Sequence, residues 1–123
     1  WYDWRDDGTD PNEREQHFGT VSHELNPKPA YIAVKTLAHL LEGYSIVERL
    51  DLGKDADFAL RLRSGESEAL AFWTLDEEHE VMLPIGGGEG TLSSIFGDEN
   101  PISWDDEGLK AVISQNPQYL IVK

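Results

Sequence analysis

The sequence predicts a mainly β protein: an antiparallel β-sandwich of about seven or eight strands, preceded by a long loop and one amphipathic α-helix. Three observations lead to this prediction. Apolar residues recur at helical spacing over residues 29–42, and from residue 44 onward they alternate with polar residues. Turn signals then separate the apolar runs about every 8–12 residues. We therefore expect two units, residues 1–43 and residues 44–123.

The first 28 residues have no sustained period. Residues 1–4 alternate bulky and polar side chains, as the end of a strand does. Residues 5–28 are interrupted by Asp-Gly, Asp-Pro, Asn-Pro and Lys-Pro pairs, which are typical of turns. We expect a long ordered loop here. A loop of this length is usually functional or a sign of missing structure.

The helix prediction has defined ends. Pro29 suits a first helical turn, and Gly43 suits a left-handed residue that ends the helix. The apolar stripe between them consists of Ala30, Ala33, Val34, Leu37 and Leu41, with Leu40 at its margin. Such a stripe has to be buried against something. We expect it to cause self-association through the helix at 29–42, or local rearrangement, in the isolated chain.

The strands are expected at residues 45–50, 57–63, 69–75, 79–84, 91–96, 101–104, 109–114 and 118–122. In the second strand, Phe58, Leu60 and Leu62 should face the core. The third is apolar on both faces and should be central. The aromatic residues of these strands, Phe72, Trp73, Phe96 and Trp104, are expected in the core or an interface.

The glycine-rich run at 86–90 is expected to be a flexible hairpin connection. It lacks the Lys-Ser/Thr pair of a phosphate-binding loop, and no long helix follows it.

The composition restricts the possible partners. Twenty-four acidic residues against ten basic ones give a formal net charge of −14, which disfavours nucleic acid and anionic membranes and suits a neutral ligand such as a glycan. The chain has no cysteine, so disulfides and zinc–thiolate sites are excluded. No apolar run approaches the roughly 18 residues of a membrane span.

Neither a metal site nor a catalytic site is predicted. The acidic cluster could hold calcium, but its spacing does not match an EF-hand loop; its members are Asp6, Asp7, Asp10, Glu13 and Glu15. The four histidines have no metal-ligand spacing, and no serine stands in a nucleophile-elbow sequence. Among 24 acids some pair always meets the spacing of glycoside hydrolysis, so acid pairs are uninformative. We expect no cofactor.

Trp1, Tyr2 and Trp4 lie within four residues beside the long loop. Aromatic faces stack on the C–H faces of sugar rings, so these residues are candidates for sugar contact. The alternative is that they pack against a neighbouring part of the protein.

Three motifs carry a resemblance to a known group of enzymes. The run Trp1–Pro11 with its DDGTDP sequence, the pair Phe18-Gly19 and the KPAY run at 28–31 resemble the closing segment of clan A glycoside hydrolases. These are retaining (β/α)8-barrel enzymes related to cellulases and β-xylosidases. Residues 44–123 resemble their small C-terminal β-sandwich, through the run Ala69–Thr74 and the last strand.

The resemblance implies a polysaccharide or oligosaccharide as ligand. Trp1 matches the tryptophan that stacks under the sugar, Trp4 lies beside it, and Asp6 and Asp7 fall in the loop that borders the cleft. The catalytic glutamates of the clan lie on the fourth and seventh barrel strands, so no catalytic residue is assigned and the isolated chain is expected to be inactive. Residues 1–43 would be the last strand, loop and helix of the barrel, which would be the partner of the helix.

The resemblance alone favours a secreted or periplasmic location. Two alternatives remain: an independent carbohydrate-binding module and a protein-interaction domain.

Overall fold

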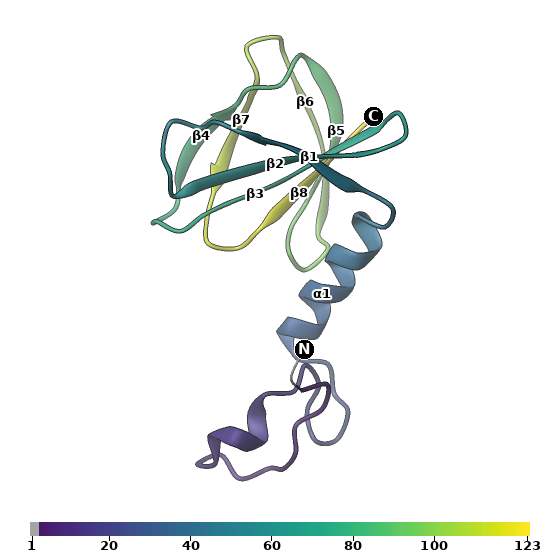
Figure 1. Cartoon of the computed structure of the whole chain (residues 1–123), viewed down its shortest axis with the longest axis vertical. Coiled ribbons are helices and arrows are strands. Elements are labelled where there is room, and N and C mark those ends of the chain that lie inside the picture. The colour runs from purple at the N-terminus through teal and green to yellow at the C-terminus, as the bar shows by residue number, and fades with distance from the viewer. Residues whose placement is uncertain (1–2) are drawn as a thin grey trace.

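The computed structural model describes residues 3–123 and has two parts, a β-sandwich and an N-terminal loop, which one helix connects (Figure 1). The loop contains a short 3-10 helix, η1 (Arg14–His17), and the connecting helix is α1 (Pro29–Leu40). Trp1 and Tyr2 lie outside the described residues, so the predictions made for them are untested. Within the described chain, no helix is long and apolar enough to cross a membrane.

The predicted fold class is confirmed. Residues 45–122 form eight strands: β1 (Ser45–Leu50), β2 (Asp57–Ser64), β3 (Ser67–Thr74), β4 (His79–Leu83), β5 (Gly88–Ser93), β6 (Glu99–Trp104), β7 (Leu109–Ile113) and β8 (Gln118–Val122). Their order is β1-β2-β3-β8-β5-β6 in one sheet and β4-β7 in the other. All neighbouring strands are antiparallel, and β3 is an inner strand, as predicted.

Helix α1 begins and ends close to the predicted positions. Pro29 occupies its first turn, and the N–H of Leu41 donates to the carbonyl of Leu37 at 3.1 Å in the last turn. Gly43 follows with φ of +78°, the left-handed conformation that favours glycine.

The six-stranded sheet carries an apolar cluster on each face. One face packs on the β4-β7 sheet around a core of Leu50, Ala59, Leu70, Phe72, Leu83, Ile85, Leu109, Ala111, Ile113 and Leu120. The other face carries a smaller cluster of Leu62, Ala69, Ala71 and Tyr119, against which Leu40, Leu41 and Tyr44 pack. The C-terminal end of α1 therefore lies on the outer face of the large sheet.

The prediction that Phe58, Leu60 and Leu62 of β2 face the core between the sheets is wrong. Ala59 faces the core between the sheets, together with its cross-strand partner Phe72. Leu60 and Leu62 face the outer cluster. Because β2 contributes to an apolar cluster on each face of the sheet, alternation alone could not identify the inner face. Phe58 also lies on the outer face, where it stacks on Trp73 with 5.0 Å between ring centroids and an interplanar angle of 3°.

The prediction of a hairpin at residues 86–90 is wrong. Strand β4 belongs to the small sheet and β5 to the large one, so residues 84–87 cross from one sheet to the other. The glycines from Gly88 onward are part of β5. Gly90 lies against the backbone of β8, where a side chain would collide with the carbonyl of Ile121. The crossing is fixed by a 2.6 Å hydrogen bond from Trp104 Nε1 to the carbonyl of Gly86.

Candidate functional site

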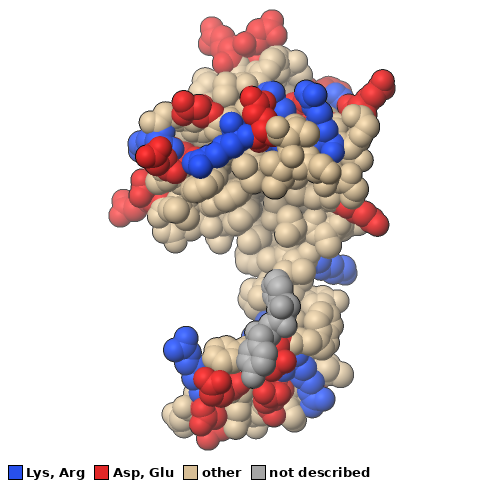
Figure 2. All heavy atoms as spheres, in the orientation of Figure 1, with Lys and Arg blue, Asp and Glu red and all other residues tan. Residues whose placement is uncertain are grey.

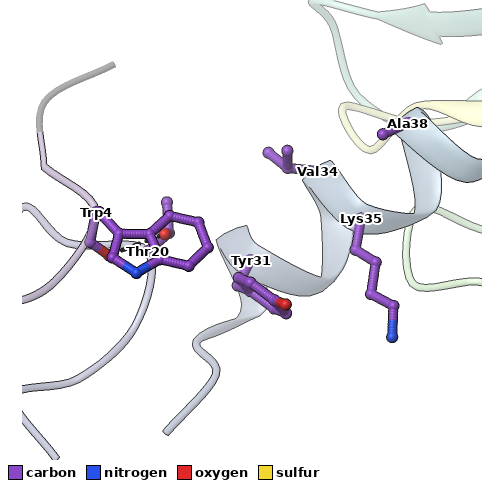
Figure 3. Close-up of a pocket in the computed structure, with 6 residues that line it drawn as sticks. All are labelled: Trp4, Thr20, Tyr31, Val34, Lys35 and Ala38. Carbon is purple, nitrogen blue, oxygen red and sulfur yellow. Dashed lines mark hydrogen bonds between the residues drawn. The ribbon is translucent and has the colours of Figure 1, made fainter. Parts of the chain in front are cut away.

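The aromatic candidate Trp4 lies where the N-terminal loop meets helix α1. Its side chain is 61% exposed, and its ring meets that of Tyr31 edge-on, with 5.6 Å between centroids. The two rings line a groove of about 290 Å³. Figure 3 shows them next to each other, with Val34, Lys35 and Ala38 further along α1. The groove is lined by Trp4, Thr20, Tyr31, Val34, Lys35 and Ala38. It offers an apolar, partly aromatic surface of the kind that suits a sugar ring or an apolar side chain.

The backbone of Trp4 is fixed by the returning loop. Its carbonyl accepts hydrogen bonds from the N–H of Thr20 at 2.9 Å, from the Thr20 hydroxyl at 3.0 Å and from the N–H of Val21 at 3.1 Å. Arg5 and Val21 form an isolated parallel bridge. The segment that carries Trp4 is therefore held like a short strand.

Asp6, predicted to border a sugar cleft, points into the loop. It is 7% exposed, and its Oδ1 accepts from the N–H of Gly19 at 2.9 Å and from Lys28 Nζ at 2.9 Å. The hydrogen bond from Lys28, assisted by those from Gly19 and His17, outweighs the effect of burial and lowers the pKa of Asp6. Its carboxylate thus binds the loop itself, and its predicted contact with sugar stays a prediction.

Asp7 is exposed and lies in a different depression from Trp4. A polar hollow of about 270 Å³ is lined by Arg5, Asp6, Asp7 and His23. The structure therefore brings Asp6 and Asp7 to one hollow and leaves Trp4 in the neighbouring apolar groove.

The remaining loop acids serve local turns. The Asp10 carboxylate accepts from the N–H of Asn12 at 3.0 Å, and Glu13 caps η1. Among the described residues, no group of three or more acidic or histidine side chains could hold a metal ion.

A second polar cluster, which sequence reasoning missed, joins the two sheets. Asp57 on β2 is 2% exposed; its Oδ1 accepts from the Thr74 hydroxyl at 2.8 Å and its Oδ2 from His79 Nε2 at 3.0 Å. His79 on β4 donates its Nδ1 proton to the carbonyl of Glu77 at 2.8 Å. Because a carboxylate and a carbonyl can only accept, this arrangement of oxygen atoms around both ring nitrogens favours the doubly protonated ring of His79.

The pKa values of Asp57 and His79 shift in opposite directions. Burial raises the pKa of Asp57, but the hydrogen bonds from His79 and Thr74 outweigh burial and lower it overall. The hydrogen bonds to Glu77 and Asp57 raise the pKa of His79. The Thr74 hydroxyl donates to Asp57, not to His79, so the cluster is no nucleophilic triad. It is an ion pair that connects the sheets.

Comparison with solved structures identifies the class of protein that this fold resembles. A family 39 glycoside hydrolase from the gut symbiont Bacteroides cellulosilyticus matches 100% of this chain with a TM-score of 0.83 and 30% sequence identity. A family 30 endoxylanase from Clostridium papyrosolvens matches 84% of it with a TM-score of 0.67 and 6% identity, a likeness of fold alone. No family model matches the chain, and no curated protein does.

The chain spans 26% of the family 39 enzyme and 30% of the endoxylanase. It is similar in structure to the C-terminal part of these enzymes, which confirms the predicted resemblance to clan A glycoside hydrolases.

Proposed function

We propose that this chain is the closing segment and accessory β-sandwich of a polysaccharide-degrading glycoside hydrolase, and that α1 joins it to the catalytic barrel. Residues 1–43 would belong to the barrel, and residues 44–123 would form the accessory domain. One observation carries the proposal: α1 carries an apolar stripe, yet none of its residues is buried in the described part of the chain.

The apolar surface of α1 is wider than the predicted stripe. Val34 and Leu37, which belong to the stripe, are 38% and 43% exposed. Ile32, which is 39% exposed, lies on the opposite side at about 100° per residue. That side also carries Lys35, Thr36 and His39, so the helix stays amphipathic, and its apolar stripe is of the kind that packs on a protein core. The sandwich covers only its C-terminal end, so a further apolar surface has to cover the rest.

The charge distribution supports the same arrangement. Although the chain has a net charge of −14, no acidic residue lies between Pro29 and Leu41. Figure 2 shows acidic and basic side chains gathered on the loop and on the sandwich, with a largely uncharged waist between them. A surface with so few charges is typical of a region that packs against another part of a protein, not of one that faces solvent.

The proposal gives the sandwich a supporting role. It anchors α1 through Leu40 and Leu41, and the barrel would bury the exposed length of the helix. The fold shared with an endoxylanase makes xylan the first substrate to test. No catalytic residue is assigned to residues 1–123, so the pure chain should release no reducing sugar.

The decisive experiment is to sequence the coding DNA upstream of the Trp1 codon. The proposal expects an in-frame run of roughly 250 codons with the strand–helix alternation of a barrel. A start codon or a signal peptide directly before Trp1 would contradict it.

A second function, a stand-alone carbohydrate-binding module, is favoured by the exposure of Trp4 above an apolar groove. Electrophoresis through gels that contain xylan, β-glucan or mannan tests it. Retardation that Trp4→Ala abolishes and Phe96→Ala preserves would support sugar binding at Trp4. Phe96 is a matched control because it is also half-exposed, at 50%, on the other side of α1. Phe96 was predicted to lie in the core or an interface; its exposure excludes the core, and the interface stays a prediction. Lack of retardation by all three polysaccharides would exclude this function.

A further inference from the structure

The loop contains a polar bridge whose position relative to Trp4 indicates a role beyond folding. Asp6 lies two residues after Trp4, and Lys28 immediately precedes helix α1. Lys28 Nζ reaches both carboxylate oxygens of Asp6, at 2.9 and 3.3 Å, and also donates to the carbonyl of His17 at 3.0 Å. The bridge therefore connects three segments of the loop at the base of the helix.

The two residues of the bridge lie close in sequence to the two rings of the aromatic groove. Trp4 precedes Asp6 by two residues, and Tyr31 follows Lys28 by three residues. The N–H of Tyr31 donates to the carbonyl of Lys28 at 2.9 Å, which ties the first turn of α1 to the bridge residue. Two routes connect the backbones that carry Trp4 and Tyr31. One runs through Thr20, whose N–H donates to the Trp4 carbonyl at 2.9 Å and whose carbonyl accepts from the N–H of Lys28 at 3.0 Å. The other is the Asp6–Lys28 contact, which joins the two segments through side chains.

Close packing leaves the bridge little freedom. Gly19 lies so close to the backbone of Arg5 and Asp6 that a side chain there would collide with both. This approach brings the N–H of Gly19 to Asp6 Oδ1. A carboxylate that accepts both a backbone N–H and an ammonium proton holds its position well.

We propose that Asp6 and Lys28 are positioning residues that hold Trp4 edge-on to Tyr31 and thereby shape the aromatic groove for its ligand. The inference rests on the proposed role of Trp4 as a sugar contact. It assigns Asp6 to the support of the site and not to its surface.

Other charged groups surround the bridge and enter the test. His17 Nδ1 lies 3.6 Å from Asp6 Oδ2, and His23 Nδ1 bonds to the Asp6 carbonyl at 3.2 Å. Arg5 Nη2 lies 3.3 Å from His23 Nε2. Lys28 is the group whose hydrogen bond most strongly lowers the pKa of Asp6. Removal of its charge should therefore shift the protonation of Asp6 to higher pH, whereas an Arg at this position should restore the wild-type behaviour.

The test is fluorine NMR of the chain labelled with 5-fluorotryptophan, in which Trp4→Phe identifies the Trp4 signal. In the wild-type protein the transition of the Trp4 shift that reports Asp6 should lie below pH 3.8, the ordinary pKa of an aspartate. Asp6→Asn should displace the signal at neutral pH and remove the acid transition. Lys28→Met should move the transition to higher pH, and Lys28→Arg should return the transition to its wild-type pH. Glu15→Gln, which removes an exposed acid from the same loop, is the matched control and should change nothing.

Trp4 signals that are the same in the wild type, Asp6→Asn and Lys28→Met at every pH would overturn the inference. Titration with xylo-oligosaccharides separates this result from the fate of the proposed function. If the wild type binds, Asp6→Asn should weaken binding by about tenfold, a change of about 1.4 kcal/mol, and unchanged binding would also count against a positioning role. If the wild type binds no sugar, the sugar contact at Trp4 is wrong, and the fluorine shifts still decide whether Asp6 and Lys28 position the ring.

Discussion

The sandwich and the N-terminal loop with its helix are held together by different forces. The sandwich has a closed apolar core in which Leu70, Phe72 and Leu120 are fully buried. Among residues 3–40, Val21 is the single buried apolar residue, and the loop depends on hydrogen bonds and on the Asp6–Lys28 ion pair.

This difference indicates how each part is stabilised. A buried aliphatic or aromatic side chain contributes about 1.5–3 kcal/mol, whereas a typical hydrogen bond contributes a net of only about 0.5–1.5 kcal/mol. The sandwich can therefore support its own fold. In the N-terminal part the polar groups are hydrogen-bonded to one another, but most apolar side chains are exposed. This is expected of an element whose apolar side chains pack against another surface.

The largest expected effect comes from the sandwich core. Phe72→Ala leaves a cavity between the sheets and should lower the free energy of unfolding by about 3–5 kcal/mol. Urea unfolding followed by far-UV circular dichroism measures this change. Phe96→Ala, which truncates a half-exposed ring, is the control and should cost far less. Equal losses in the two variants would show that the core does not dominate stability.

Substitutions on the exposed face of helix α1 should change self-association rather than the free energy of unfolding. We expect the isolated chain to self-associate through its exposed apolar residues, and Leu37→Asp to weaken that association by about tenfold or more, given the 1.5–3 kcal/mol of a buried aliphatic side chain. Sedimentation velocity over a range of concentrations measures the effect.

Ile46→Asp is the matched control for α1, because Ile46 is an apolar residue of β1 with 63% exposure. A wild-type chain that sediments as a monomer and binds no hydrophobic dye would contradict the self-association.

The Asp57–His79 pair should make the sandwich sensitive to pH, by a smaller amount. The pKa of His79 lies above its ordinary value of 6.5, so its contribution is complete below pH 6.5 and disappears as the pH rises through the folded-state pKa. The pKa of Asp57 lies below 3.8, so its contribution is complete above pH 3.8 and disappears as the pH falls further. The difference in unfolding free energy between wild type and His79→Gln should therefore be largest between pH 3.8 and 6.5.

Urea titrations at several pH values measure this profile. His39→Gln, which changes an exposed histidine of α1, should show no such maximum. A difference between wild type and His79→Gln that does not vary with pH would rule out the ion pair.

The smallest effect concerns the junction between the two parts. Gly43→Ala places a side chain at φ of +78° and should cost about 1 kcal/mol. Gly86→Ala is the control, because a side chain there meets nothing within 4 Å and the residue has no positive φ. Thermal unfolding of both variants measures the difference, and equal midpoints would show that the junction tolerates the strain.

Local patterns in the sequence were sufficient to predict the elements. The period of residues 29–42 and the turn residues that separate the strands act over short distances, so α1 and the eight strands lie near their predicted positions. The side that each strand presents to the core was harder to predict. Phe58, Leu60 and Leu62 form a regular apolar face, but only the packing of Leu40 and Leu41 on the outer side shows that this face is not the inner one.

Long-range polar contacts gave no sequence signal. Asp57 and His79 are separated by 22 residues and lie in different sheets, so nothing near either residue indicates the pair. Asp6 resembled a solvated loop acid, because its burial depends on Lys28, which is also 22 residues away. The exposure of Trp4 could be predicted as one of two alternatives, but its edge-on contact with Tyr31 required the loop to fold back on the helix.

The place of β8 in the large sheet has a consequence for biosynthesis. This strand pairs with β3 on one side and β5 on the other, so it joins the β1-β2-β3 half to the β5-β6 half. A nascent chain leaves the ribosome N-terminus first. The edges of β3 and β5 that pair with β8 therefore stay unpaired until residues 118–122 have emerged. Helix α1 has no complete sheet to pack on during that interval, so translation is the stage at which the apolar surfaces of this chain are most exposed.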